Sequence, residues 1–296
     1  MRTVDVAERI KGAKQLPALS ASNQKVLKML GSSNASVHEL AAALAQSPQL
    51  TACILKLANS AAYGGVETTK LPQAIMRVGL NMLRTLVLSN SVLQRVSSVG
   101  QVSELDRKGY WRYCLGVGIA ARAVAYRGRM EIADDAFLAG LIHGIGVTVL
   151  DVFYPDELRI AIATVKTKQD TLSSAIKSAT ELTLGEIGAA LVEEWQLGQR
   201  VGKAVALMDK PGIQDSDENV GKLVDCLFAG IALTRAANIG KPLDGRAPLA
   251  GGVAPGWSLM DKRIELALAN CGLTPEVFAK RTEDLKSDFA VFESLA

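Results

Sequence analysis

Apolar side chains recur along most of the chain at intervals of three or four residues, which is the spacing of one face of an α-helix. Val26 and Leu30 belong to one such stripe, and Leu50, Ile54 and Leu57 belong to another. The sequence shows no strictly alternating apolar and polar positions, no hairpin turn pairs and no fixed-period repeat. The pattern therefore predicts an all-α, multi-helical protein.

Polar residues mark the ends of the predicted helices at spacings that cap them. Ser36 and Glu39 have the spacing of a capping box, in which each side chain bonds the backbone N–H of the other residue. Pro48 suits the first turn of the next helix. Ser103 to Asp106 resembles a second capping box, with Asp in place of Glu. It predicts that a long helix begins there.

These boundaries divide the chain into four segments. Residues 1–100 form a predicted N-terminal helical lobe, and residues 101–240 form a second helical lobe. Residues 241–257 are rich in Gly and Pro, which is typical of a linker or loop. Residues 258–296 are predicted to form a C-terminal helical extension.

Residues Ala133 to Phe153 are predicted to be helical. They include the most apolar run near the middle of the chain, Ala136 to Leu150, which is interrupted by His143 and several glycines. It is also shorter than the roughly 20 apolar residues that a membrane span needs. The N-terminal segment carries acids and bases and lacks the apolar run of a signal peptide. We therefore expect a cytoplasmic protein without a membrane segment.

Charge is distributed unevenly. The net charge is +3, but residues 1–100 hold 11 Lys and Arg against 4 Asp and Glu, whereas residues 101–296 hold 22 against 26. The basic N-terminal half could face an acidic partner, with Lys25 and Lys28 as a candidate partner-binding surface, or it could be an ordinary solvated surface. The basic residues are scattered, and few aromatic residues lie beside them, which argues against a nucleic-acid surface.

Cysteine and histidine usage limits the chemistry that the chain can perform. The chain has four cysteines: Cys53, Cys114, Cys226 and Cys271. None has a CxxC spacing, so they are predicted to be buried free thiols, with a reactive or metal-binding cysteine as the alternative. The only histidines are His38 and His143. A Ser/His/Asp or Cys/His site would need one of them, but neither has the sequence context of such a site, and no Walker A loop occurs.

Three stretches carry a family resemblance: ILKLANSAAYG at 54–64, AIMRVGL at 74–80 and AFLAGLIHGIG at 136–146. Together they resemble the HDOD family, the HD-related output domain, over about residues 12–240. The residues that match the family's motifs are Asn59, Ser60, Tyr63, Gly64, Gly79, Gly140 and Gly146. The resemblance implies an N-terminal helical lobe packed on a helical lobe related to the HD-domain phosphohydrolases.

The enzymes of that superfamily bind divalent metals through His and Asp side chains that converge from several helices, and the metal activates water. The corresponding positions fall here on Tyr113, His143, Gly144, Leu184 and Gly230. Only His143 among these residues is a His or Asp, so the resemblance implies a degenerate site with no catalytic residues, no metal and no cofactor. Several acids could form an all-oxygen metal site instead: Asp134, Asp135, Asp151, Glu181, Glu186 and Asp209.

The resulting hypothesis is a non-catalytic bacterial signal-transduction module that acts through protein–protein interaction. The resemblance also implies a link to cyclic-dinucleotide or two-component signalling. Two alternatives stay open. One is a metal-dependent phosphohydrolase with an atypical site, and the other is a nucleotide or nucleic-acid binder that uses the basic N-terminal lobe. Metal analysis tests the first alternative, and salt-dependent binding tests the second.

Overall fold

The structure is a computed structural model that describes eleven stretches of the chain. These are residues 3–10, 21–30, 36–60, 63–64, 67–96, 100–128, 130–168, 171–195, 197–210, 212–243 and 262–292. All regular elements in these stretches are helices, which confirms the all-α prediction. The predicted Gly/Pro-rich segment lies almost entirely outside the described residues.

The chain forms two compact units. The small unit contains residues 17–98 and 287–296, and the large unit contains residues 1–16 and 99–286. The helices of the small unit are α2 (Ala21–Leu30), α3 (Val37–Leu44), α4 (Pro48–Ala58), α5 (Leu71–Val78) and α6 (Leu80–Val96). The predicted boundaries of the four segments, and the packing of one lobe on the other, stay predictions.

The large unit holds most of the helices. They are α1 (Thr3–Ile10), α7 (Arg107–Arg127), α8 (Ala133–Ile142), α9 (Ile145–Phe153), α10 (Pro155–Lys168), α11 (Leu172–Thr180), α12 (Leu184–Glu194), α13 (Gln199–Ala206), α14 (Glu218–Ala236) and α15 (Lys262–Asn270). Helix α16 (Pro275–Phe292) begins in this unit, and its residues from 287 onward are counted with the small unit.

The predicted capping box at the start of α3 is present. The Ser36 hydroxyl oxygen accepts a hydrogen bond from the Glu39 backbone N–H at 3.1 Å, and the Glu39 carboxylate accepts one from the Ser36 backbone N–H at 3.2 Å. Helix α4 begins at Pro48, as predicted, and Ser47 caps it by accepting from the Leu50 backbone N–H. Local sequence therefore determines where these two helices begin.

The predicted start of α7 is wrong by one helical turn. Asp106, and not Ser103, is the N-cap, and its carboxylate accepts a hydrogen bond from the Gly109 backbone N–H at 2.8 Å. The Ser103 hydroxyl instead donates to the Glu104 carboxylate. Residues just before Ser103 are held outside the helix, because the Val102 backbone N–H donates to the buried carboxylate of Asp151 at 2.8 Å.

The apolar region Ala133–Phe153 is not one continuous helix. It is divided into α8 and α9 by a turn at His143 and Gly144. By length and composition this region could cross a membrane, and among the described residues it is the single such candidate. However, 94% of its most apolar window is buried inside the structure, so its apolar side chains form core rather than an exposed surface.

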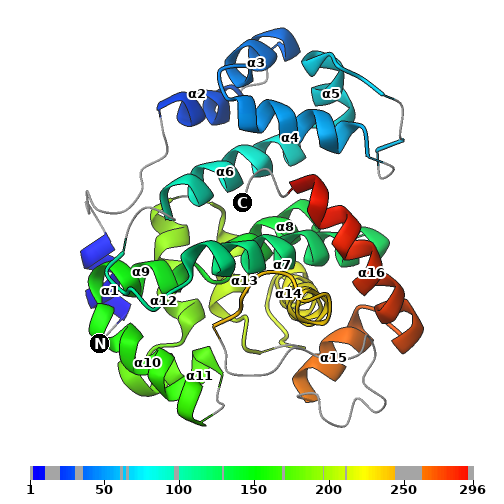
Figure 1. The fold of residues 1–296 in the computed structure, drawn as a ribbon. Helices are drawn as coiled ribbons and strands as arrows, with labels where there is room; N and C mark the ends of the chain where they lie inside the picture. Colours follow the sequence, from blue (N-terminus) through cyan, green and yellow to red (C-terminus); the bar gives the residue numbers. More distant parts are fainter. Residues whose placement is uncertain are drawn as a thin grey trace. The chain divides into compact units, whose positions relative to one another are not determined.

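The centre of the large unit is built on α7, which packs against both α8 and α14 (Figure 1). The crossing of α7 and α8 is close because both helices carry glycine there. A β-carbon at Gly140 would lie only 2.6 Å from the Cα atom of Gly118. Gly230 of α14 lies against the backbone of Val117 and Ala121 in α7. Glycine at these positions lets the helices approach more closely than larger residues would.

Candidate functional site

The residues onto which the family resemblance places the metal-ligand positions are only partly brought together. Tyr113 of α7 and the turn residues His143 and Gly144 converge where the N-terminal part of α7 meets the end of α8. The rings of Tyr113 and His143 form an edge-to-face pair with centroids 5.6 Å apart. Leu184 lies against α9 at Gly146, and Gly230 lies against α7 one to two turns beyond Tyr113.

The His143 side chain is buried, with 4% of its surface exposed. Its Nδ1 atom lies 2.6 Å from the Gly140 carbonyl oxygen. Because a carbonyl oxygen only accepts, Nδ1 carries the proton and donates. Burial lowers the pKa of His143 to about 4, although the bond to Gly140 works in the opposite direction. The imidazole is therefore neutral near pH 7 and acts as an internal polar group.

The space beside Gly144 is filled by two side chains of α7. A β-carbon at Gly144 would collide with the Tyr110 hydroxyl oxygen and would lie 2.9 Å from the Cys114 sulfur. The Tyr110 hydroxyl also donates to the Gly144 carbonyl oxygen at 3.4 Å. Burial raises the pKa of the Cys114 thiol, so this sulfur is neutral and unreactive. No room is left for a carboxylate at position 144.

The residues present do not fit the divalent metal centre that the family resemblance implies. His143 offers one nitrogen at most, since Nδ1 already bonds Gly140. Within the described parts of the chain, no three His, Cys, Asp or Glu side chains converge as a metal site would require. The other histidine, His38, lies exposed in α3 of the small unit. A working site needs several ligands in one place.

The acids proposed as an alternative oxygen site have separate structural roles. Asp134 pairs with Arg122, Asp135 with Arg200, and Asp151 with Arg107. The Glu186 carboxylate completes a capping box with Thr183 at the start of α12. Asp209 accepts from the Ser173 hydroxyl, and Glu181 is exposed at the end of α11. These carboxylates do not assemble into one site.

Asp151 has the most extensive bonding of these acids. Its carboxylate is 1% exposed and accepts hydrogen bonds from the backbone N–H groups of Gln101 and Val102 at 2.9 and 2.8 Å. It also receives two bonds from the Arg107 guanidinium, at 2.7 and 2.9 Å. The carboxylate thus fixes the segment before α7 to the end of α9. It is a structural residue and is not available to a metal.

The family-motif residues of the small unit stabilise turns. The Asn59 amide pairs with the backbone of Thr68, donating to its carbonyl oxygen at 3.0 Å and accepting from its N–H at 2.8 Å. The Ser60 hydroxyl donates to the Leu57 carbonyl oxygen at 2.8 Å. Tyr63 lies in the turn that follows. Gly64 and Gly79 have positive φ angles of 93° and 84°, which favour glycine.

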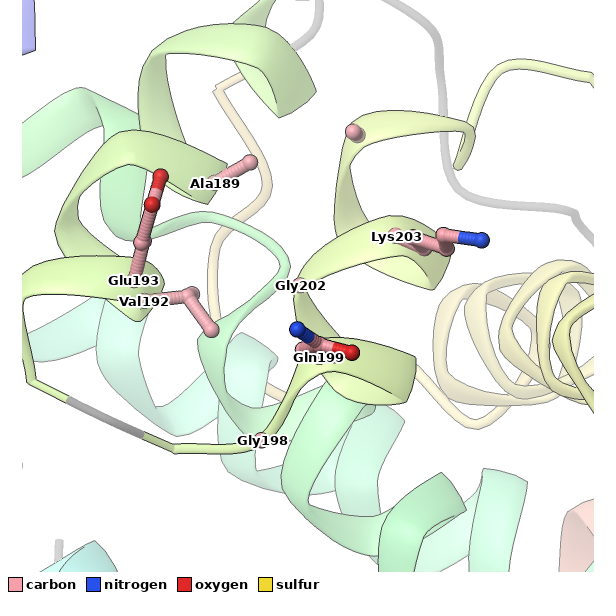
Figure 2. Close-up of a pocket in the computed structure, with 8 residues that line it drawn as sticks. Ala189, Val192, Glu193, Gly198, Gln199, Gly202 and Lys203 are labelled. Atoms are coloured by element: carbon pink, nitrogen blue, oxygen red, sulfur yellow. The ribbon is translucent and has the colours of Figure 1, made fainter.

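Two surface hollows lie within single units. A hollow of about 610 Å³ lies between α12 and α13, and Figure 2 shows Ala189 and Val192 of α12 facing it across from Gln199 of α13. The amine of Lys203, at its edge, points away and pairs with Asp215 at 3.3 Å. A hollow of about 440 Å³ in the small unit is lined by Leu55, Lys56, Asn59, Ser60, Ala290 and Val291. Neither brings together groups suited to catalysis.

Lys25 and Lys28 are both exposed on α2. Their spacing of three places them on one side of the helix. Sequence reasoning correctly predicted Cys114 to be a buried free thiol but did not place it beside Gly144. It missed Tyr110, which belongs to no motif, and the hydrogen-bonding role of Asp151. Only the packing of α7 against the turn at Gly144 reveals the placement of Tyr110 and Cys114.

Comparisons with known proteins agree with this architecture. The family model of the HDOD domain matches residues 16–211, which are 196 of the 296 residues. An uncharacterised protein of Treponema pallidum (strain Nichols) is 28% identical over 205 residues, which cover 66% of this chain and 37% of that protein. The matched region is thus well under half the length of that relative.

Solved structures share the fold at low sequence identity. An HDOD domain protein of unknown function from Geobacter sulfurreducens has a TM-score of 0.72 at 20% identity, covering 100% of this chain and 98% of its own. A candidate phosphohydrolase from Shewanella amazonensis has a TM-score of 0.69 at 20% identity, covering 98% of both chains. A candidate signal-transduction protein from Marinobacter aquaeolei has a TM-score of 0.63 at 19% identity, covering 98% of this chain and 63% of its own.

Proposed function

Because the chain belongs to the HDOD family, we propose that it is a non-catalytic signal-transduction module that acts by binding a protein partner. The observation that carries this proposal is the filled space beside Gly144. The Tyr110 hydroxyl and the Cys114 thiol occupy the place where the second metal-binding side chain would project. Placing a carboxylate at position 144 would require the Tyr110 and Cys114 side chains to move. The site therefore differs from a metal centre in its packing as well as in its residue types.

Phosphoester hydrolysis is the second candidate function. Its support is the name of the Shewanella amazonensis relative, a candidate phosphohydrolase with the same fold. Similarity of fold alone does not transfer an activity, because activity depends on the side chains of the site. The neutral, hydrogen-bonded His143 and the absence of converging ligands in the described residues favour binding over hydrolysis.

The small unit offers a surface suited to an acidic protein partner. Residues 17–98 contain seven Lys and Arg but only two Asp and Glu. Lys25 and Lys28 lie exposed on one side of α2, and Lys56, Lys70 and Arg84 are exposed elsewhere in the same unit. A surface of this charge attracts acidic surfaces over distances of about one Debye length, roughly 8 Å at physiological salt. The name of the Marinobacter aquaeolei relative is consistent with such a signalling role.

Reversing two charges on α2 tests this proposal. Lys25→Glu with Lys28→Glu is expected to weaken binding of the partner captured from the native host on the order of tenfold, mainly by slowing association. The free energy of unfolding should be nearly unchanged, because both side chains are exposed. Surface plasmon resonance of the captured partner on both proteins gives the rates.

A matched control is Lys166→Glu with Lys177→Glu, which changes the net charge equally on exposed positions of α10 and α11 in the large unit. This control should bind the partner almost as well as the parent. If both double substitutions weaken partner binding equally, binding depends on the net charge of the protein and not on the surface of α2. Unchanged binding by the α2 pair would contradict the proposed surface.

A further inference from the structure

Three sulfur-containing side chains that are distant in sequence meet in the large unit. Met130 precedes α8, Cys226 lies within α14, and Cys271 directly follows α15. The Cys226 sulfur lies 3.8 Å from the Met130 sulfur. Cys271 lies beside Cys226, and the interaction of the two thiols, with burial, raises the pKa of Cys271. Three separate segments therefore bring their sulfur atoms to one location.

The residues that precede the two cysteines hold the segments in place. The Asn270 amide donates to the Asp225 carboxylate at 2.8 Å, and the Gly212 backbone N–H donates to the same carboxylate at 2.7 Å. Asn270 and Asp225 are the immediate neighbours of Cys271 and Cys226 in the sequence. Helix α15 is thus fixed against α14 beside the thiol pair. These hydrogen bonds fix the two segments that carry the cysteines, so the positions of Cys226 and Cys271 are set by the packing of α14 against α15.

We propose that Cys226, Cys271 and Met130 form a binding site for a single Cu(I) ion. Thiolate and thioether sulfur are soft ligands, which favour Cu(I), zinc and iron–sulfur clusters over hard cations, and the thioether in this set suits Cu(I). With metal–sulfur bonds of about 2.3 Å, three sulfurs arranged in a plane around one ion lie about 4 Å apart. The separation of 3.8 Å between the Cys226 and Met130 sulfurs agrees with that geometry. This inference does not depend on the proposed function.

Other metals fit the ligand set less well. A structural zinc site needs four ligands drawn from Cys, His and carboxylate groups. Among the described residues no three His, Cys, Asp or Glu side chains converge, so the third ligand here is the thioether of Met130. A thioether is a good ligand for Cu(I) but a poor one for zinc or magnesium. Of the other cysteines in the large unit, Cys114 is packed against Tyr110 and Gly144 and is not part of this group.

The three sulfur-containing residues differ in exposure. Cys226 is fully buried, whereas Cys271 and Met130 are partly exposed. Each copper–thiolate bond forms as an S–H bond breaks and its proton passes to the buffer, while Met130 binds through a sulfur lone pair. Copper stays as Cu(I) throughout, so no oxidant or reductant takes part. The bound ion would join the segment before α8, α14 and the end of α15.

Titration with Cu(I) tests the site. The reduced, full-length protein is titrated without oxygen against the chromophoric chelator bathocuproine disulfonate, and copper is counted by elemental analysis. One Cu(I) per chain should remain bound in competition with the chelator. Cys226→Ser and Cys271→Ser should each weaken binding by at least about a hundredfold, and Met130→Leu by about tenfold. Cys53→Ala, a buried cysteine of the small unit, is the matched control and should bind like the parent.

X-ray absorption of the copper-loaded parent provides a test without any substitution, so a variant that fails to fold does not decide the question. The proposal expects only sulfur ligands at about 2.3 Å. It is overturned if the chelator removes all copper from the parent, if nitrogen or oxygen ligands dominate the spectrum, or if folded Cys271→Ser retains copper as tightly as the parent.

Discussion

Replacing Asp151 with alanine is expected to lower the free energy of unfolding by about 3–5 kcal/mol, the usual loss when one partner of a buried ion pair is removed. The change leaves the Arg107 guanidinium without its carboxylate and deprives the Gln101 and Val102 backbone N–H groups of their acceptor. Urea unfolding of the parent and the variant measures the difference.

The matched control is Asp156→Ala, which breaks the pair of Asp156 and Arg159 on the surface of α10. The Asp156 side chain is 86% exposed, so this loss should be less than about 1 kcal/mol. Equal small losses in the two variants would contradict the role assigned to Asp151. A large loss in both would indicate a general effect of charge.

Acidic pH is expected to lower the free energy of unfolding because of His143. The pKa of this buried side chain is about 4 in the folded protein, below its ordinary value of 6.5. Between these two values the unfolded chain takes up a proton that the folded protein excludes, so stability falls as the pH drops from 6.5 to 4. The predicted loss is about 3 kcal/mol. His143→Gln, which stays neutral, should lack this component.

The quantity to measure is the difference in unfolding free energy between the parent and His143→Gln at several pH values. The difference is needed because other groups also titrate. Burial raises the pKa of Asp225, which opposes acid destabilisation, and the Arg200 hydrogen bond lowers the pKa of Asp217, which adds to it below about pH 4. These contributions are common to both proteins and cancel. A difference that is constant from pH 7 to pH 4 would refute the assignment.

The helices were predictable where local sequence determines them. The Ser36 and Glu39 capping box and Pro48 act within a few residues, so the pattern gave the correct starts for α3 and α4. The start of α7 was predicted wrongly because Asp151, nearly fifty residues away, holds the segment before it. The division between α8 and α9 was likewise missed, because the apolar pattern continues through the turn at His143 and Gly144.

The sequence limits which side chains the candidate site can contain. Two histidines in the whole sequence cannot supply a multi-histidine metal centre. What fills the space could not be predicted, because Tyr110, Cys114 and Gly144 meet only when α7 packs on the end of α8. The meeting of Cys226 with Cys271 and Met130 has the same origin. Contacts between side chains on different helices produce no recognisable spacing pattern in the sequence.

The most direct test of the central claim is turnover of phosphodiester substrates. Purified parent and His143→Gln are incubated with a cyclic dinucleotide and with bis(p-nitrophenyl) phosphate, in the presence of Mn²⁺ or Fe²⁺, and products are quantified over many potential turnovers. Circular dichroism confirms that both proteins are folded. The filled, neutral site predicts that both proteins match the rate of buffer with metal alone. Repeated turnover by the parent that is lost in folded His143→Gln would contradict a non-catalytic function.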